Sequence, residues 1–276
     1  MLASAYRHHR TGGFATGASE LPNIFRRWRI LPTDLPMTMR ENLFRPIHKG
    51  LRFMIYETGL RLGTTDFSNV VDSNEVMDRL RHDLSSASSS CMLCLLRVHA
   101  DHEERDLFSA VRPFVPGVVD GLIAQHGEIL RRIERVSQMC DELSGLTDSQ
   151  RRVDLGDQLN AEVDSLFTFY LGHLTDEETQ VVPVMWQRFT DEQLRALRAQ
   201  FYNRIPIERF EEWMRWTIPA LNLNELFVFL SGMKAEPTPN RFADAMRVAK
   251  ATLDPSRWQA VESHVGRDFV SRPPVS

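Results

Sequence analysis

The chain has 276 residues, of which 42% are hydrophobic and 25% are charged, and its formal net charge is −4. This length allows one large domain or two small ones, and the composition excludes wholesale disorder and fibrous repeats. No apolar stretch approaches the ~18 residues that cross a bilayer, so we expect no membrane segment. The slightly acidic balance disfavours a nucleic-acid-binding surface. Three cysteines are too few for a disulfide framework, and we expect a reducing, cytoplasmic location.

Residues 1–40 differ in composition from the rest of the chain. They contain six arginines but only two acidic residues, Glu20 and Asp34. No apolar run of the ~7–15 residues found in secretory signals follows the arginines, although the arginine-rich bias is weakly typical of transit peptides. We therefore expect a loose N-terminal extension, and Met37 or Met39 is an alternative start.

Four long helices are predicted over residues 41–190. Each segment carries apolar residues at the spacing of an amphipathic helix, and the connections are short. The serine-rich residues 85–90 are a weak point at which the second helix could break. This pattern predicts an all-α fold with an up-down-up-down four-helix bundle. The four helices are expected near residues 43–62, 72–114 (capped by Asp72 or Ser73), 118–143 and 149–189.

A smaller helical region is predicted over residues 191–270, followed by a loose tail over residues 271–276. Thr190 and Gln193 have the spacing of a capping box at its start. The region is rich in aromatic residues, which would either cap the bundle or bind a protein partner. Its helices are expected near residues 191–203, 206–217, 223–233, 240–252 and 255–265.

Two segments of the chain repeat the pattern His-x-x-x-Glu-Glu. The first contains His99 and Glu103, and the second contains His173 and Glu177. Residues four apart in a helix lie on the same face, ~6 Å apart along the axis. Both pairs lie on the apolar face, where unpaired polar groups would be costly to bury but a metal ion would satisfy them. One copy alone is commonly a surface pair, whereas two inward copies favour a metal site.

Each of the other two long helices adds one inward histidine, His48 in the first and His126 in the third. At ~1.5 Å per residue, the positions of these residues along an up-down bundle place them close to the level of the two glutamates. Four imidazoles and two carboxylates without a thiolate favour a pair of iron or manganese ions over structural zinc.

With these motifs, residues 42–189 resemble the hemerythrin-like (HHE) family. Residues 44–48 (Phe-Arg-Pro-Ile-His) and 125–126 (Gln-His) are similar to that family's first-helix and third-helix elements. The resemblance implies two iron ions, with or without an oxo or hydroxo bridge, and Glu103 and Glu177 as bridging ligands. The ligands that it implies are His48, His99, Glu103, His126, His173 and Glu177.

One position departs from the oxygen-carrying hemerythrins, which have a second histidine four residues after the third-helix histidine. Here that position is Leu130. The ligand set is most similar to that of the bacterial iron-centre repair proteins and of some iron-sensing hemerythrin domains. Many of the repair proteins also carry an N-terminal domain with cysteines, but here no cysteine precedes Cys91.

The resemblance implies a protein that responds to oxygen, nitric oxide or iron and redox state, with a diatomic gas or peroxide as its ligand. The alternative is a di-iron enzyme, either an oxidase or peroxidase or an iron donor in iron-sulfur cluster repair. The sequence does not decide between them.

Three further positions lie close to the motifs. His102 is offset from His99 by about 60° around the helix and is a boundary residue or, alternatively, a metal ligand or proton relay. Cys91 and Cys94 form a Cys-x-x-Cys pair that we place in the middle of the second helix, where two buried small residues are the simpler interpretation. The alternative is a redox-responsive pair close to the iron end of the bundle. Tyr170 is interpreted as a core residue with a satisfied hydroxyl, or alternatively as a hydrogen-bond donor to a ligand.

Overall fold

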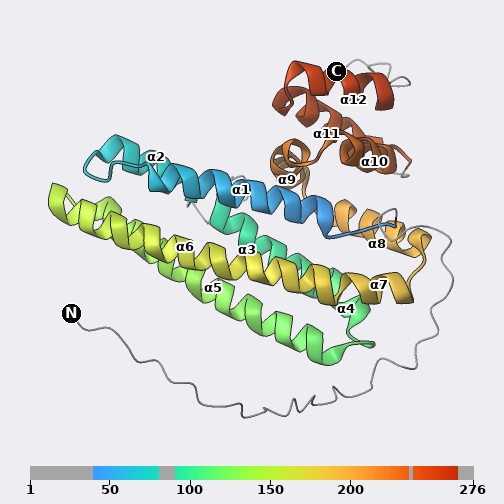
Figure 1. Ribbon diagram of the computed structural model, residues 1–276, viewed down its shortest axis with the longest axis horizontal. Coiled ribbons are helices and arrows are strands. Elements are labelled where there is room, and N and C mark those ends of the chain that lie inside the picture. The colour runs from blue at the N-terminus through green and yellow to red at the C-terminus, as the bar shows by residue number, and fades with distance from the viewer. Residues whose placement is uncertain (1–39, 81–90, 236–238, 267–276) are drawn as a thin grey trace, which may run out of the picture. The chain divides into compact units, whose positions relative to one another are not determined.

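The computed structural model describes residues 40–80, 91–235 and 239–266. Helices that run in alternating directions form a bundle (Figure 1). This confirms the predicted all-α bundle followed by further C-terminal helices. Apart from Arg40, the predicted N-terminal extension lies outside the described residues, as do Met37, Met39, the weak point at 85–90 and the tail at 271–276. The bundle helices are α1 (Arg45–Gly63), α2 (Val70–Leu80), α3 (Met92–His102) with its continuation, α5 (Pro116–Gly145) and α6 (Ser149–Gln180).

Local sequence signals set the ends of these helices. Proline occupies the first turn of both α1 and α5, where its missing N–H costs no hydrogen bond. The Asp148 side chain caps α6 by accepting a hydrogen bond from the backbone N–H of Arg151 at 2.8 Å. The predicted apolar faces of the bundle helices pack into two hydrophobic clusters. The helix lengths that the sequence specifies therefore determine where the two His-x-x-x-Glu motifs lie along the bundle axis.

The prediction of one continuous helix over residues 72–114 is wrong. Asn69 caps α2, because its side-chain oxygen accepts from the backbone N–H of Val71 at 2.9 Å, so the helix begins before Asp72. Cys91 has an extended backbone and begins a new helix, α3, as its N-cap residue. The Cys91 sulfur accepts from the backbone N–H of Cys94 at 3.1 Å. A sulfur that serves as the cap is a signal that hydrophobic periodicity does not show.

The helix that begins at Met92 changes from α-helical to π-helical at Glu103. Glu103–Phe108 (η3) is a π-helical segment, and a short α4 (Ser109–Val111) ends the helix three residues before the predicted end at Phe114. Single π-helical turns inside α-helices are uncommon and are frequent at functional sites. Here the segment begins at Glu103, one of the predicted metal ligands.

The fourth predicted helix, over residues 149–189, is divided in two. α6 ends at Gln180, and α7 (Val182–Arg188) follows with Pro183 in its first turn. Proline cannot donate to the preceding turn of a helix, which accounts for the interruption.

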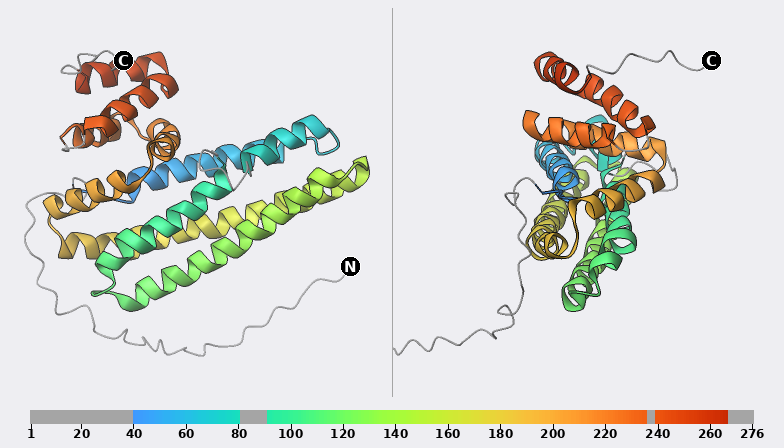
Figure 2. Two further views of the ribbon diagram at one scale, coloured as in Figure 1. Left: turned by 180° about the vertical axis from the view of Figure 1, so that it is seen from behind. Right: turned by 90° about the vertical axis from the view of Figure 1, so that its right-hand side faces the viewer.

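The C-terminal helices follow the predicted positions closely. The capping box of Thr190 and Gln193 is present at the start of α8. α9 packs against α1, and α11 packs on α9 (Figure 2). The approach of α1 to α9 is tight, since a methyl group on Gly50 would lie 2.9 Å from the Thr217 backbone. These helices are α8 (Asp191–Arg204), α9 (Ile207–Ala220), α10 (Leu223–Lys234), α11 (Pro239–Thr252) and α12 (Pro255–Val265).

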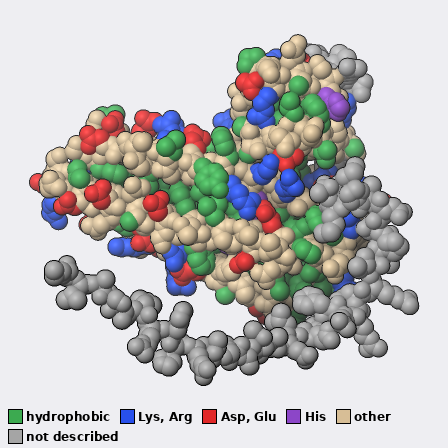
Figure 3. Space-filling view, viewed as in Figure 1, with side chains coloured by type: hydrophobic (Ala, Val, Ile, Leu, Met, Phe, Trp, Pro, Cys, Tyr) green, Lys and Arg blue, Asp and Glu red, His purple; other side chains and the backbone are tan. Residues whose placement is uncertain are grey.

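Within the described residues, no helix is both long enough and apolar enough to span a bilayer. On the face shown in Figure 3, acidic and basic side chains are interspersed, and the described surface of the bundle shows no histidine. The histidines of the bundle motifs are instead buried.

Candidate metal centre

All six side chains singled out from the sequence meet inside the bundle. His48 comes from α1, His99 and Glu103 come from α3 and η3, His126 comes from α5, and both His173 and Glu177 come from α6. Each is at most 5% exposed. They form two overlapping groups, within each of which the ligand-type atoms lie within 4.8 Å of one another. One group is His48, His99, Glu103 and Glu177, and the other is Glu103, His126, His173 and Glu177.

The two carboxylates are common to both groups. Glu103 Oε1 lies 3.0 Å from His99 Nε2 and 3.5 Å from His48 Nε2, and its Oε2 lies 3.6 Å from His126 Nε2. Glu177 likewise places one oxygen 3.4 Å from His48 Nε2 and the other 3.3 Å from His173 Nε2. Each carboxylate therefore directs one oxygen to each group, which is the arrangement of a ligand that bridges two cations.

Hydrogen bonding within the protein does not satisfy these groups. His99 Nε2, Glu103 Oε2 and both oxygens of Glu177 are buried and have no hydrogen-bond partner among the described residues. Buried polar atoms without partners are uncommon in folded proteins because each costs stability. Cations bound between the imidazoles and the carboxylates would satisfy all of them, so these residues fit a pair of metal ions.

The ionisable groups at the centre shift one another's pKa values. Burial alone would raise the pKa of Glu103, but the neighbouring imidazoles of His99, His126 and His48 hold it well below its ordinary value. Burial and the neighbouring Glu103 carboxylate raise the pKa of Glu177. Burial disfavours the charged form of His48, yet hydrogen bonds to Glu103 and Glu178 raise its pKa to about 9. The two carboxylates thus repel each other unless positive charge lies between them.

Three of the four histidines are held through the ring nitrogen that faces away from the centre. His48 Nδ1 lies 3.0 Å from Glu178 Oε1, and Arg52 donates two hydrogen bonds to the same carboxylate. His126 Nδ1 lies 2.8 Å from Glu104 Oε1.

His173 Nδ1 lies 2.7 Å from Gln125 Oε1, whose amide nitrogen donates to Asp176 at 2.9 Å. All three partners are oxygens that can accept a hydrogen bond from Nδ1, so a metal bound at the centre would take the Nε2 atom of each ring.

The residues that hydrogen-bond the Nδ1 atoms of these histidines were not identified from the sequence. Glu104 and Glu178 are the second glutamates of the two repeated motifs, and each holds a histidine of a different helix. The doubling of glutamate in both copies was the available signal, since a single ligand carboxylate in each motif would not require it.

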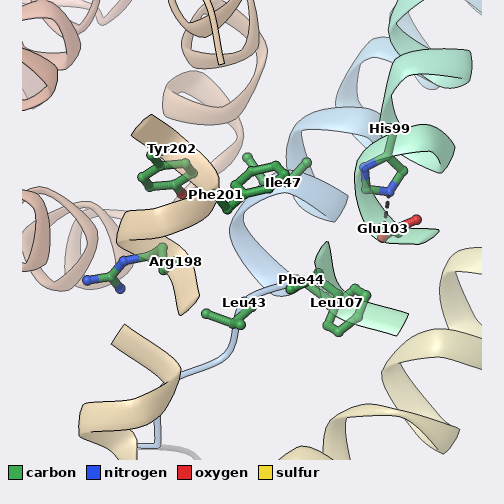
Figure 4. Close-up of a pocket in the computed structure, with 9 residues that line it drawn as sticks. All are labelled: Leu43, Phe44, Ile47, His99, Glu103, Leu107, Arg198, Phe201 and Tyr202. Carbon is green, nitrogen blue, oxygen red and sulfur yellow. Dashed lines mark ion pairs between the residues drawn. The ribbon is translucent and has the colours of Figure 1, made fainter. Parts of the chain in front are cut away.

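His99 differs from the other three histidines. Its Nδ1 hydrogen-bonds none of the described residues, and its ring lies beside a cavity of about 30 Å³ (Figure 4). In that view, His99 and Glu103 lie on one side of the cavity, and the α8 side chains Phe201 and Tyr202 lie on the other. A second cavity, of about 10 Å³, also reaches His99 and is bordered by Trp213 of α9. The C-terminal helices therefore form part of the wall of the centre.

The other residues singled out near the motifs are not part of the two groups of ligand-type side chains. His102 is buried against Phe201 and belongs to neither metal group, and burial together with Arg105 lowers its pKa to about 4. Cys91 and Cys94 form a disulfide at the N-terminus of α3, so placing the pair in the middle of a helix was wrong.

Tyr170 is buried as predicted, but its hydroxyl has no hydrogen-bond partner in the described part of the chain, contrary to the core interpretation. Burial and the Glu103 and Glu177 carboxylates raise the pKa of Tyr170 well above its ordinary value.

A comparison with protein families gave one match. Residues 66–185 match the family model described as the hemerythrin HHE cation binding domain. The match includes five of the six side chains at the centre, and His48 lies before it. Neither the curated proteins nor the solved structures gave a match. Residues 66–185 are therefore similar to the hemerythrin HHE cation binding domain.

Proposed function

We propose that the chain is a non-haem di-iron protein that binds a small ligand at its metal pair and responds to oxygen, nitric oxide or iron and redox state. The observation that carries this proposal is the pair of buried carboxylates shared between two histidine pairs. In the proposed centre, His48 and His99 hold one ion, His126 and His173 hold the other, and Glu103 and Glu177 bridge them. Nitrogen and bridging carboxylate ligands without thiolate suit iron.

When bound, the iron pair would supply reversible redox chemistry and open coordination positions. The chain supplies the rest of the chemistry. Glu178, Glu104 and Gln125 fix the orientation of three imidazoles, so their Nε2 atoms point at the centre. The buried apolar core around the site excludes bulk water.

The cavity beside His99 supports a ligand of small size. Its volume of about 30 Å³ is roughly two to three times the ~10–15 Å³ that a cavity needs to hold one water molecule. The side chains around it are mainly apolar: Leu43, Phe44, Ile47, Leu107 and Phe201. A diatomic gas or peroxide fits this space, and a large organic substrate does not.

Variants of single ligands test the shared-carboxylate arrangement. Glu177→Ala should remove both ions, because the carboxylate contributes to both positions. His126→Ala removes a ligand from one position, so about one tightly held iron should remain per chain. The measurement is iron content after anaerobic loading with ferrous iron and desalting. Equal losses in the two variants would contradict the proposal.

The function of the loaded protein is tested with its ligands. Mixing the diferrous protein anaerobically with nitric oxide should change the optical spectrum in proportion to the iron bound. Sustained consumption of hydrogen peroxide, or transfer of iron to a protein that lacks its iron-sulfur cluster, would instead support the enzyme or iron-donor alternative. No spectral change with nitric oxide, oxygen or peroxide would contradict the ligand-binding proposal.

A further inference from the structure

Tyr170 is the buried polar residue beside the centre that the proposed ligand set leaves without a role. It lies on α6, one turn before His173, and is 1% exposed. Its hydroxyl finds no hydrogen-bond partner among the described residues. A tyrosine in an apolar core normally satisfies its hydroxyl, because the unpaired group costs stability. Phenylalanine would pack equally well here if the hydroxyl had no partner in any state of the protein.

The Tyr170 ring lies near one histidine of each proposed metal position. Its centroid is 6.5 Å from that of His99, which belongs to one position, and 6.0 Å from that of His173, which belongs to the other. The Trp213 N–H is also buried without a partner, but its ring is close to His99 alone, at 5.8 Å. Of these two donors, only Tyr170 approaches a histidine of each position.

The nearby carboxylates do not take the Tyr170 hydrogen bond. Glu103 Oε2 and both Glu177 oxygens are acceptors without partners, yet none is within hydrogen-bonding reach of the hydroxyl. The Tyr170 hydroxyl and these acceptors are therefore not hydrogen-bonded to one another, although the Tyr170 ring lies within 6.5 Å of two of the proposed ligand rings. A third group bound at the centre would satisfy the hydroxyl.

We propose that Tyr170 donates a hydrogen bond to the small ligand held at the metal pair and thereby strengthens its binding. This inference rests on the proposed function. The ligand class is a small molecule or anion with an exposed lone pair, such as a diatomic gas, peroxide or azide. Tyr170 acts here as a ligand-binding residue and not as a metal ligand, since each of the two groups of imidazoles and carboxylates is complete without it.

The test compares Tyr170→Phe with Tyr56→Phe in the full chain. Both substitutions remove one hydroxyl oxygen, but Tyr56 is 61% exposed on α1. Each protein is loaded with iron, oxidised and titrated with azide, and the optical change gives the affinity. Loss of one neutral hydrogen bond predicts that Tyr170→Phe binds azide about fivefold more weakly than wild type. The azide affinity of Tyr56→Phe should be unchanged. The infrared stretch of bound azide should also shift only in Tyr170→Phe.

Thermal unfolding of the iron-free proteins separates this role from a structural one. Because the hydroxyl has no partner among the residues that the structure describes, Tyr170→Phe should leave the iron-free midpoint unchanged or raise it. A lower iron-free midpoint would show that the hydroxyl stabilises the fold, and it would contradict the inference.

The inference and the proposed function fail in different ways. Equal azide affinity in wild type and Tyr170→Phe, with equal iron content, would overturn the inference alone. Loss of iron from Tyr170→Phe would also overturn it, because the phenol would then be a metal ligand. Wild-type protein that binds no iron would overturn the proposed function, and the inference with it.

Discussion

The hydrogen bonds on the outer ring nitrogens decide how well the histidines are prepared to bind metal. Glu178 illustrates this, because it accepts from His48 Nδ1 and is itself held by two hydrogen bonds from Arg52. The carboxylate makes the imidazole a stronger electron donor and fixes its orientation. Its contribution should therefore appear in metal affinity even though it does not touch the metal.

Glu178→Ala should weaken iron binding by about tenfold or more, because His48 loses the acceptor that sets its tautomer. Glu178→Gln keeps an acceptor oxygen and should weaken binding less. The control is Glu142→Ala, which removes an exposed carboxylate from α5. Competition with a ferrous chelator gives the affinities. An affinity unchanged in Glu178→Ala would show that the hydrogen bond does not prepare the site.

Glu212 on α9 predicts a pH dependence of stability that is separate from the metal ligands. Burial raises its pKa from 4.5 to about 7, against the opposing effect of Arg209. The folded protein therefore holds a proton that the unfolded chain releases above pH ~4.5, so this group makes the fold less stable as the pH rises from about 4.5 to 7.

Glu212→Gln should remove this loss and raise the free energy of unfolding by about 1–3 kcal/mol at pH 8, with little effect near pH 4.5. Urea unfolding of both proteins across this pH range is the measurement. Glu208→Gln, on an exposed position of the same helix, is the control and should change little. A parallel pH profile in wild type and Glu212→Gln would contradict the assignment.

At the level of elements, the contact between α1 and α9 depends on a glycine. A methyl group on Gly50 would lie 2.9 Å from both Cα and Oγ1 of Thr217, so the two backbones would have to separate. Gly59, on the same helix, has only ordinary contact at 3.6 Å with the Phe167 ring. The two glycines therefore respond oppositely to the same substitution.

Gly50→Ala should lower the free energy of unfolding by about 1–3 kcal/mol through overpacking. Gly59→Ala should raise it by up to about 1 kcal/mol, because alanine favours the helix over the unfolded chain. Chemical denaturation of the two variants measures both effects. Destabilisation by Gly59→Ala equal to that of Gly50→Ala would contradict the close approach of α1 and α9.

Helix positions were predictable wherever conventional capping residues mark the ends. Thr190, Asn222 and Asp254 each cap a C-terminal helix with a side-chain oxygen, and these helices lie within a few residues of the expected ranges. The start of α3 was not predictable, because Cys91 is an unusual cap and the apolar period continues past it. The π-helical turn at Glu103 also leaves no mark on the sequence, since His99 and Glu103 keep a helical spacing.

Some residues of the candidate site were likewise predictable from the sequence, and others were not. The pairs His99–Glu103 and His173–Glu177 follow from helix geometry alone, and their convergence follows from helix lengths. Glu104 and Glu178 could not be assigned, because each acts on a histidine of a neighbouring helix. That pairing depends on how the helices are rotated against each other, which a single sequence does not specify.

At the scale of the whole molecule, the centre extends beyond the matched domain. His48 precedes residues 66–185, and Phe201, Tyr202 and Trp213, which border the two cavities beside His99, follow them. The C-terminal helices are thus placed to control the space next to one metal position. The domain boundary predicted at residue 190 coincides with the start of α8, and separate folding of the two parts stays a prediction.

The central claim is that six buried side chains hold two iron ions per chain. Anaerobic titration of the metal-free full chain with ferrous iron, followed by a Mössbauer spectrum of the oxidised product, tests it directly. The account predicts saturation at two irons per chain and a spectrum of two coupled ferric ions. Saturation at one iron or none, or a spectrum of isolated ferric ions, would contradict it.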